Sequence, residues 1–285
     1  MRIVVVGARG QLGAAVVHAA RVAHDVVPLD RAALDIGDAA AVRTRMHELR
    51  PDVVINCAAY NAVDAAEDRP EDAIRGNALA VRNLVRALPG ATLVHYSSDF
   101  VFDGTASRPY VETDTPNPLS VYGMSKLMGE WFARDAARAY VLRVESLFGR
   151  APDAAPAKGS VAAIVNALLA GQTPRVFEDR TVTPTSVTDC ARATLALLEH
   201  QAPPGVYHCV NSGSCTWLGL AQEVARILAL PPRFETVRFD EVTLKARRPK
   251  YCALSNEKLI ATGAAMPDWQ HALRESLAAA SPQPR

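Results

Sequence analysis

Short runs of consecutive apolar, mostly β-branched residues alternate along the chain with longer stretches of helical character. The runs predict strands at 2–7, 25–30, 52–59, 91–98 and 139–146. The stretches between them predict helices at 11–23, 38–49, 71–88 and 120–137. The strands are apolar throughout, which is typical of a parallel sheet covered by helices on both faces. This part of the chain therefore predicts an α/β fold, a Rossmann-like doubly wound parallel sheet.

The pattern loosens after Gly149. Residues 150–160 are rich in Ala, Pro and Gly and predict an exposed loop. Beyond them the sequence predicts helices near 161–171, 187–200 and 216–229, and strands around 175–177, 205–210 and 234–239. We expect a dinucleotide-binding domain over 1–150 and a smaller C-terminal substrate-binding lobe over 151–285, with some later elements free to extend the main sheet.

Composition narrows the class of partner. The chain has 285 residues, with 31 Lys+Arg against 30 Asp+Glu, so we expect neither nucleic acid nor an anionic membrane as a partner. The apolar runs are too short to span a membrane, and no signal peptide is recognised. The five cysteines are scattered without a C-x-x-C, which favours free thiols in the cytoplasm over disulfides or a zinc site.

Three glycines, Gly7, Gly10 and Gly13, follow the first predicted strand and open the first predicted helix. Only glycine lets the backbone turn so sharply and approach a pyrophosphate, which then lies at the positive end of the helix. The spacing is G-x-x-G-x-x-G rather than G-x-G-x-x-G. Its position within a βαβ unit nevertheless predicts a dinucleotide site.

The cofactor itself stays open between NAD(H) and NADP(H). Asp30 ends the second predicted strand, where a carboxylate accepts the adenosine ribose hydroxyls and repels a 2′-phosphate. Arg31 beside it and Arg9 in the glycine loop can each bind that phosphate instead. The segments 34–36 and 57–60 are expected at the same edge of the sheet.

Candidate catalytic groups follow the fourth predicted strand. Ser98 and Asp99 end that strand, at the carboxyl edge where such sheets bind ligands. Tyr122 and Lys126 come one helical turn apart, in a helix expected to begin near 119–120 after two prolines. An isolated Tyr-x-x-x-Lys is usually a surface pair, so a catalytic role is indicated only by all four residues together.

This combination resembles the extended short-chain dehydrogenase/reductases, with Ser98, Tyr122 and Lys126 on the Ser/Thr–Tyr–Lys triad. In that family the lysine lowers the tyrosine's pKa and holds the nicotinamide ribose, the tyrosine is the general acid or base, and the hydroxyl polarises the same oxygen. The stretches "HYSSDFVFDG", "PYVETDTPNPLSVYGMSKLMGE", "TVTPTS" and "RRPKYCALSNEKL" are similar to the dTDP-4-dehydrorhamnose reductases, over nearly the whole chain.

That resemblance implies NADPH- or NADH-dependent reduction of the C4 keto group of a dTDP-linked 6-deoxy sugar, to dTDP-L-rhamnose. It places Ser98 and Asp99 at the substrate. It places the cofactor on or beside Gly10, Gln11, Leu12, Asp30, Asp35, Ile36, Ala59, Tyr60, Tyr122 and Lys126. The glycine loop and the strand ends add Gly7, Arg9, Gly13, Arg31 and Ala58 as candidate cofactor residues. We predict no metal, and a homodimer is left open.

The chain departs from the family at Leu147, where the family often has a tryptophan at the sugar pocket. This leaves the exact sugar open. Arg247 and Arg248, which precede a proline, are candidate contacts for the substrate diphosphate. Two alternatives remain: a non-catalytic dinucleotide-binding protein resembling the methionine adenosyltransferase β subunit, and a nucleotide-sugar epimerase. Phe100 argues against a dehydratase, which usually has an acid there.

Overall fold

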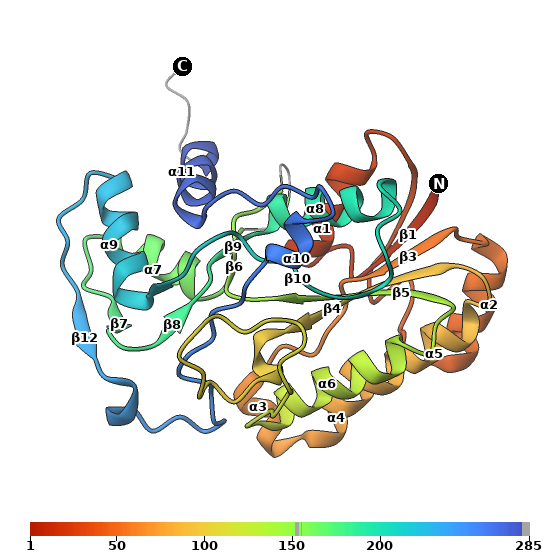
Figure 1. The fold of residues 1–285 in the computed structure, drawn as a ribbon, viewed down its shortest axis with the longest axis horizontal. Helices are drawn as coiled ribbons and strands as arrows, with labels where there is room; N and C mark the ends of the chain where they lie inside the picture. The colour runs from red at the N-terminus through yellow and green to blue at the C-terminus, as the bar shows by residue number, and fades with distance from the viewer. Residues whose placement is uncertain (152–153, 155, 281–285) are drawn as a thin grey trace.

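The structure is a computed structural model that describes residues 1–151, 154 and 156–280. A six-stranded parallel sheet lies at its centre. Its order is β10-β5-β4-β3-β1-β2 (Figure 1). The strands are β1 (Arg2–Val6), β2 (Asp25–Leu29), β3 (Val53–Asn56), β4 (Thr92–Ser98), β5 (Arg138–Val144) and β10 (Gly205–His208). The predicted fold class is confirmed. β10 comes from the C-terminal part of the chain, so a later element does extend the main sheet.

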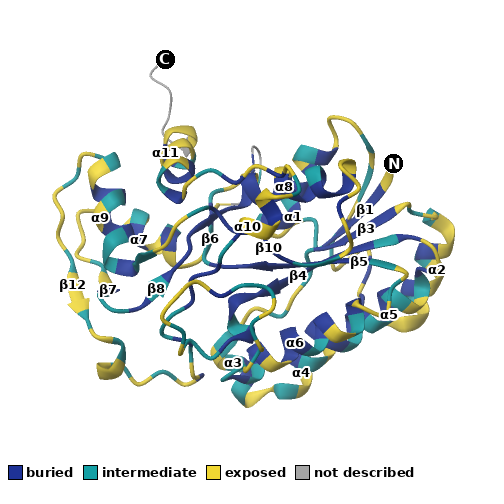
Figure 2. Ribbon diagram, in the orientation of Figure 1, coloured by how far each residue is buried: buried dark blue, intermediate teal, exposed yellow. Residues whose placement is uncertain are grey.

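Helices cover both faces of this sheet. One layer holds α1 (Gln11–Ala20), α8 (Val187–Glu199) and α10 (Glu257–Ile260), and the other holds α2 (Ala39–Leu49), α5 (Ala80–Ala87) and α6 (Val121–Ala133) (Figure 1). Ile3 and Val5 of β1 pack with the first layer, and Val4 and Val6 pack with the second. Both sides of each central strand are thus buried (Figure 2). This explains why the strands are apolar without alternation.

The predicted helix 71–88 is wrong as a single α-helix. The chain forms α3 (Val63–Asp68), α4 (Pro70–Ile74), a π-helical segment η1 (Arg75–Leu79) and then α5. A π-helical segment carries one extra residue per turn and re-aims the side chains within it, often at a functional site. Here it turns Asn77 toward the loop after β3, where Tyr60 N–H donates to Asn77 Oδ1 at 2.8 Å.

The C-terminal part of the chain has a second hydrophobic core, to which Trp217 and Trp269 both contribute, and the division into two domains at residue 150 stays a prediction. The helices of this core are α7 (Ser160–Leu169), α9 (Trp217–Ile227) and α11 (Trp269–Ala280). Short strands pair two by two: β6 (Leu147–Phe148) with β9 (Thr185–Ser186), β7 (Arg175–Phe177) with β12 (Glu235–Val237), and β8 (Thr181–Val182) with β11 (Cys215–Thr216). Residues 152, 153 and 155 of the predicted loop lie outside the described residues. No helix in the described part of the chain is long and apolar enough to cross a membrane.

Candidate active site

The strand order reverses at β1, because β2 lies on one side of it and β3 on the other. Open α/β sheets bind ligands at such a switch point, beyond the carboxyl ends of the strands. A cavity of about 620 Å³ lies at this place. Ten of the predicted cofactor residues line it: Gly7, Arg9, Gly10, Asp30, Arg31, Asp35, Ile36, Ala58, Ala59 and Tyr60.

The glycine loop is shaped as a dinucleotide requires. Gly7 has φ +75°, and a Cβ there would lie 2.6 Å from the Ala58 nitrogen. A Cβ at Gly13 would lie 2.3 Å from the Gly7 carbonyl oxygen, so α1 packs directly against the loop. Gly10 is the N-cap of α1 and is exposed. The loop therefore presents its backbone and the first turn of the helix to the cavity, which fits a pyrophosphate.

Two predicted cofactor residues direct their side chains elsewhere. Gln11 Nε2 donates to the Gly149 carbonyl at 2.6 Å and so ties the glycine loop to the chain after β6. Leu12 is buried in the core between the main sheet and the layer of α1 and α8. Any contact of Leu12 with the cofactor is therefore made by its backbone.

The groups expected to select the cofactor are already paired with one another. Arg9 Nε lies 3.0 Å from Asp30 Oδ2, and the Ala33 N–H donates to Asp30 Oδ1 at 2.9 Å. Arg31 lies 3.9 Å from Asp35. The side chains of Arg9 and Arg31 are 87% and 91% exposed, so both remain accessible to a phosphate.

Tyr122 and Lys126 lie in the first turns of α6, which begins as the sequence predicted. Ser120 is the N-cap, and its Oγ accepts the Gly123 N–H at 3.2 Å. Lys126 Nζ donates to the Tyr96 carbonyl at 2.6 Å, which anchors the lysine to β4. The rings of Tyr122 and Phe100 pack in a T-shaped arrangement, with ring centroids 5.4 Å apart. Ser98 Oγ donates to Asp99 Oδ1 at 2.9 Å.

The charges of this site follow from its burial. Burial raises the pKa of Tyr122 well above its usual value; Asp99 raises it further, and the Ser98 hydroxyl lowers it. Burial lowers the pKa of Lys126 to about 8, an effect that Glu130 opposes. At neutral pH the phenol therefore keeps its proton and most of the lysine keeps its charge. The expected effect of Lys126 on the tyrosine's pKa stays a prediction.

Sequence reasoning missed Asn77 of η1, whose hydrogen bonds join two segments of the site. Its Nδ2 donates to the Tyr60 carbonyl at 3.0 Å and to Ser125 Oγ at 2.9 Å. Ser125 Oγ in turn donates to the Tyr122 carbonyl at 2.7 Å. The side-chain amide of Asn77 thus connects the loop after β3, which contains Tyr60, to α6, which contains Tyr122. A buried asparagine in a long helical stretch was the available signal.

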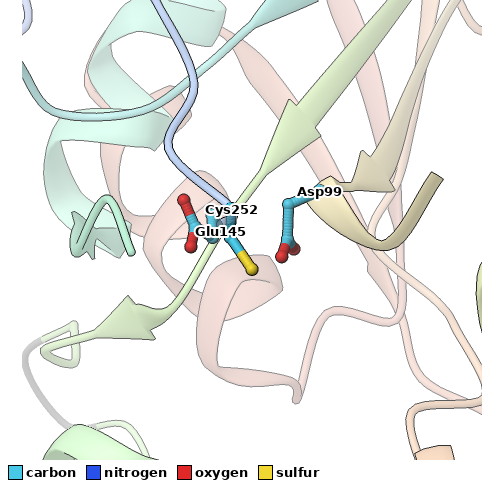
Figure 3. Close-up of side chains that lie close together, drawn as sticks. All are labelled: Asp99, Glu145 and Cys252. Carbon is cyan, nitrogen blue, oxygen red and sulfur yellow. The ribbon is translucent and has the colours of Figure 1, made fainter. Parts of the chain in front are cut away.

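Sequence reasoning also missed Glu145 and Cys252, which lie beside Asp99 (Figure 3), and Arg180, whose charge acts on Asp99. One carboxylate oxygen of Asp99, one of Glu145 and the Cys252 Sγ lie within 4.8 Å of one another. Arg180 Nε donates to the Pro249 carbonyl at 3.0 Å, and its guanidinium acts on both carboxyl groups. The signal for Glu145 was an acid placed directly after an apolar strand.

The predicted substrate residues Leu147, Arg247 and Arg248 differ in how freely their side chains can contact a substrate. Arg248 Nη2 lies 2.8 Å from Asp64 Oδ2 and joins the lobe to α3. Arg247 is exposed and forms no ion pair in the described part of the chain. Leu147 is partly buried in β6. Among the described residues Arg247 is thus the better candidate for a diphosphate contact, and both arginines stay predictions.

A doubly wound sheet, a glycine loop at its switch point and a Ser–Tyr–Lys set at the ends of β4 and α6 define a protein of the short-chain dehydrogenase/reductase class. Within that class the chain belongs to the family described as the RmlD substrate binding domain, which it matches over residues 1–281.

Named relatives agree with this family. The chain is 38% identical to a probable dTDP-4,6-dihydroxy-2-methyloxan-3-one 4-ketoreductase of Streptomyces antibioticus, over 97% of this chain and 94% of the relative. It is 34% identical to the dTDP-4-dehydrorhamnose reductase of Burkholderia thailandensis, over 96% and 97%. It superimposes on the dTDP-4-dehydrorhamnose reductase of Bacillus anthracis in complex with NADP with a TM-score of 0.89, at 30% identity over 98% and 99%.

Proposed function

We propose that the protein reduces the C4 keto group of a dTDP-linked 6-deoxy sugar with NADPH or NADH, and that dTDP-4-dehydrorhamnose is the preferred substrate. The observation that carries the proposal is a glycine-lined cavity at the switch point whose lining residues Cys57 and Tyr60 contact the Ser98, Tyr122 and Lys126 set: Cys57 acts on Lys126, and Tyr60 packs with Tyr122. Relatives that are named reductases of such sugars support the substrate class. Leu147 stands where the family often has a tryptophan, so the exact sugar stays open.

The chain's own groups account for the proton chemistry. Tyr122 keeps its proton at neutral pH because it is buried, so it can donate to the keto oxygen as negative charge develops there. The charge of Lys126 then stabilises the phenolate that remains. The Ser98 hydroxyl acts on Tyr122 and, oriented by Asp99, contributes to binding the same oxygen. The bound reduced nicotinamide, held by the glycine loop and Lys126, supplies the hydride.

The direct test is turnover. The purified protein is incubated with NADPH or NADH and a panel of nucleotide-linked 4-keto sugars, and the absorbance of the reduced cofactor is followed. We expect oxidation that depends on a dTDP-linked 4-keto sugar. Binding of the cofactor without oxidation by any sugar would contradict the proposal and favour a non-catalytic binding protein.

We predict less than about a tenfold preference between NADH and NADPH, because a carboxylate repels the 2′-phosphate and arginines attract it. Asp30→Ala should move the ratio of kcat/KM values toward NADPH, and Arg31→Ala should move it toward NADH. Arg86, exposed on α5, gives a matched control for loss of one positive charge. If neither variant changes the ratio, the adenosine ribose lies elsewhere.

We predict that Arg247→Ala weakens dTDP binding to the cofactor-loaded protein by about tenfold to a hundredfold, as a charge-assisted contact of about 1.5–3 kcal/mol implies. The loss should shrink at high salt, which screens an exposed contact. Arg248→Ala tests the neighbouring ion pair with Asp64. Calorimetry with dTDP is the measurement, with Arg86→Ala as control. Equal binding by Arg247→Ala and the control would remove Arg247 from the substrate site.

The setting of the reaction belongs to the same proposal. We infer a cytoplasmic location from five free cysteines and from a nucleotide-linked substrate. A homodimer also stays a prediction, for which light scattering of the purified protein is the measurement.

A further inference from the structure

Two carboxyl groups lie side by side at the end of the main sheet. Ser98 of β4 pairs with Val144 of β5, and the next residues along the two strands are Asp99 and Glu145. Cys252, from the segment before α10, completes the cluster, with its Sγ drawn between the two carboxyl groups in Figure 3. Asp99, Glu145 and Cys252 are 4%, 2% and 1% exposed, so the cluster is shielded from water.

The two oxygens of Glu145 are in different situations. Oε2 accepts the Thr183 N–H at 2.7 Å. Oε1 is buried and has no hydrogen-bond partner in the described part of the chain. A buried carboxylate normally has hydrogen bonds to both oxygens, because an unsatisfied charged oxygen is costly. A proton on Oε1 removes that cost.

The charges around Glu145 lead to the same assignment. The titratable groups that act on it or respond to it are Asp99, Arg180, Cys215, Tyr251 and Cys252. Arg180 is the cation of this set, and one guanidinium balances one carboxylate. Two buried carboxyl groups this close do not both ionise. Asp99 is the better anion, because it also accepts the Ser98 hydroxyl.

We propose, on the basis of the reductase function above, that Glu145 is a positioning residue: it holds the one proton of a carboxyl pair, so that Asp99 stays an anion and orients the Ser98 hydroxyl beside Tyr122. Ser98 Oγ donates to Asp99 and accepts the Phe100 N–H at 3.3 Å. Asp99 therefore decides where the Ser98 proton points. Glu145 acts on the reaction only through Asp99.

The pKa values agree with this geometry. Burial raises the pKa of Glu145 well above its usual range, and the charge of Asp99 raises it further. Burial raises the pKa of Asp99 only to about 6, because Arg180 and the Ser98 hydroxyl stabilise its anion. Between these two pKa values the pair carries one proton, on Glu145. As the pH falls through about 6, Asp99 gains a proton and releases the Ser98 hydroxyl.

The kinetic test compares two variants with opposite expectations. The pH profile of wild-type kcat should have an inflection near the pKa of Asp99, which Asp99→Asn removes. Glu145→Gln keeps a neutral polar group of the same size, so the inflection should stay in place. Glu145→Leu removes the polar group and should raise the midpoint by on the order of one pH unit, since Asp99 loses polar surroundings. A Glu145→Gln midpoint shifted downward would mean that Glu145 is ionised in the wild type, and would overturn the proposal.

A second readout does not depend on turnover. Infrared spectra at neutral pH should contain the band of a protonated carboxyl group that is missing in Glu145→Gln, whose melting temperature and NADPH binding serve as folding controls. Absence of that difference overturns the proposal even if the enzyme is active. If no sugar is reduced, the proposed function fails while the infrared result still decides the carboxyl pair.

The same three groups have donor atoms that suit a divalent cation, but the guanidinium of Arg180 opposes a second positive charge there. We therefore expect unchanged kcat after treatment with EDTA and no stoichiometric zinc binding. Zinc bound by the wild type but not by Glu145→Gln would overturn the shared-proton assignment.

Discussion

Replacing Tyr122 with phenylalanine should lower kcat for keto-sugar reduction by about a hundredfold to ten-thousandfold, the range for removal of a general acid. The phenol donates its proton only as the keto oxygen gains charge, so the loss should fall on kcat and spare KM. The ring itself, packed on Phe100, is retained by the substitution. Cofactor binding should therefore remain close to that of the wild type.

Steady-state kinetics and a cofactor titration measure this effect. Tyr207→Phe is the matched control, because it deletes a phenol that donates to the Pro203 carbonyl at 2.6 Å, away from the triad. That variant should lose a little stability and keep its turnover. A Tyr122→Phe enzyme with more than about a tenth of the wild-type kcat would exclude Tyr122 as the acid.

Replacing Lys126 with methionine should damage both cofactor binding and turnover. The lysine is expected to hold the nicotinamide ribose, and loss of a charge-assisted contact of about 1.5–3 kcal/mol weakens binding by about tenfold to a hundredfold. The phenolate also loses its stabilising charge, so kcat should fall as well. Methionine keeps most of the packing volume of the lysine stem, which limits the damage to the fold.

The pH profile separates the electrostatic role from packing. The pKa of Lys126 is lowered to about 8, so its charge is present below that pH and is lost as the pH rises through it. Wild-type kcat should therefore fall above about pH 8. A slow but active Lys126→Met enzyme should lack that decline. If the decline persists in the variant, another group is responsible and the proposed coupling to Tyr122 is wrong.

Much of the fold could be predicted because its signals are local. The strands of the main sheet are short, mostly apolar runs, and all of them were recognised from the sequence. The start of α6 was recognised because prolines exclude a helix and Ser120 caps the next one. The helix over 71–88 was misjudged, since η1 depends on the contacts of Asn77 with Tyr60 and Ser125.

The candidate site likewise contains residues that the sequence indicated and residues that only the structure brought together. Gly7, Gly13, Asp30, Ser98, Tyr122 and Lys126 were named as candidates because the chemistry requires those residue types at those places in a βαβ pattern, and their roles stay predictions. Arg247 and Arg248 stay candidates for the substrate diphosphate, and the structure adds that Arg248 pairs with Asp64. Glu145 belongs to no motif, and its only signal was an acid at the end of an apolar strand. Its importance appears only when its neighbours are known.

The sequence by itself thus determined the α/β class, the glycine loop and the identity of the groups at the ends of β4 and α6. These depend on periodicity and backbone requirements that a few adjacent residues express. Only the tertiary structure decided that β10 joins the main sheet, that Arg180 and Cys252 meet Asp99, and that Glu145 Oε1 is buried without a hydrogen-bond partner among the described residues. These contacts join residues far apart in the chain, and their effect on charge arises from burial, which no short stretch of sequence specifies.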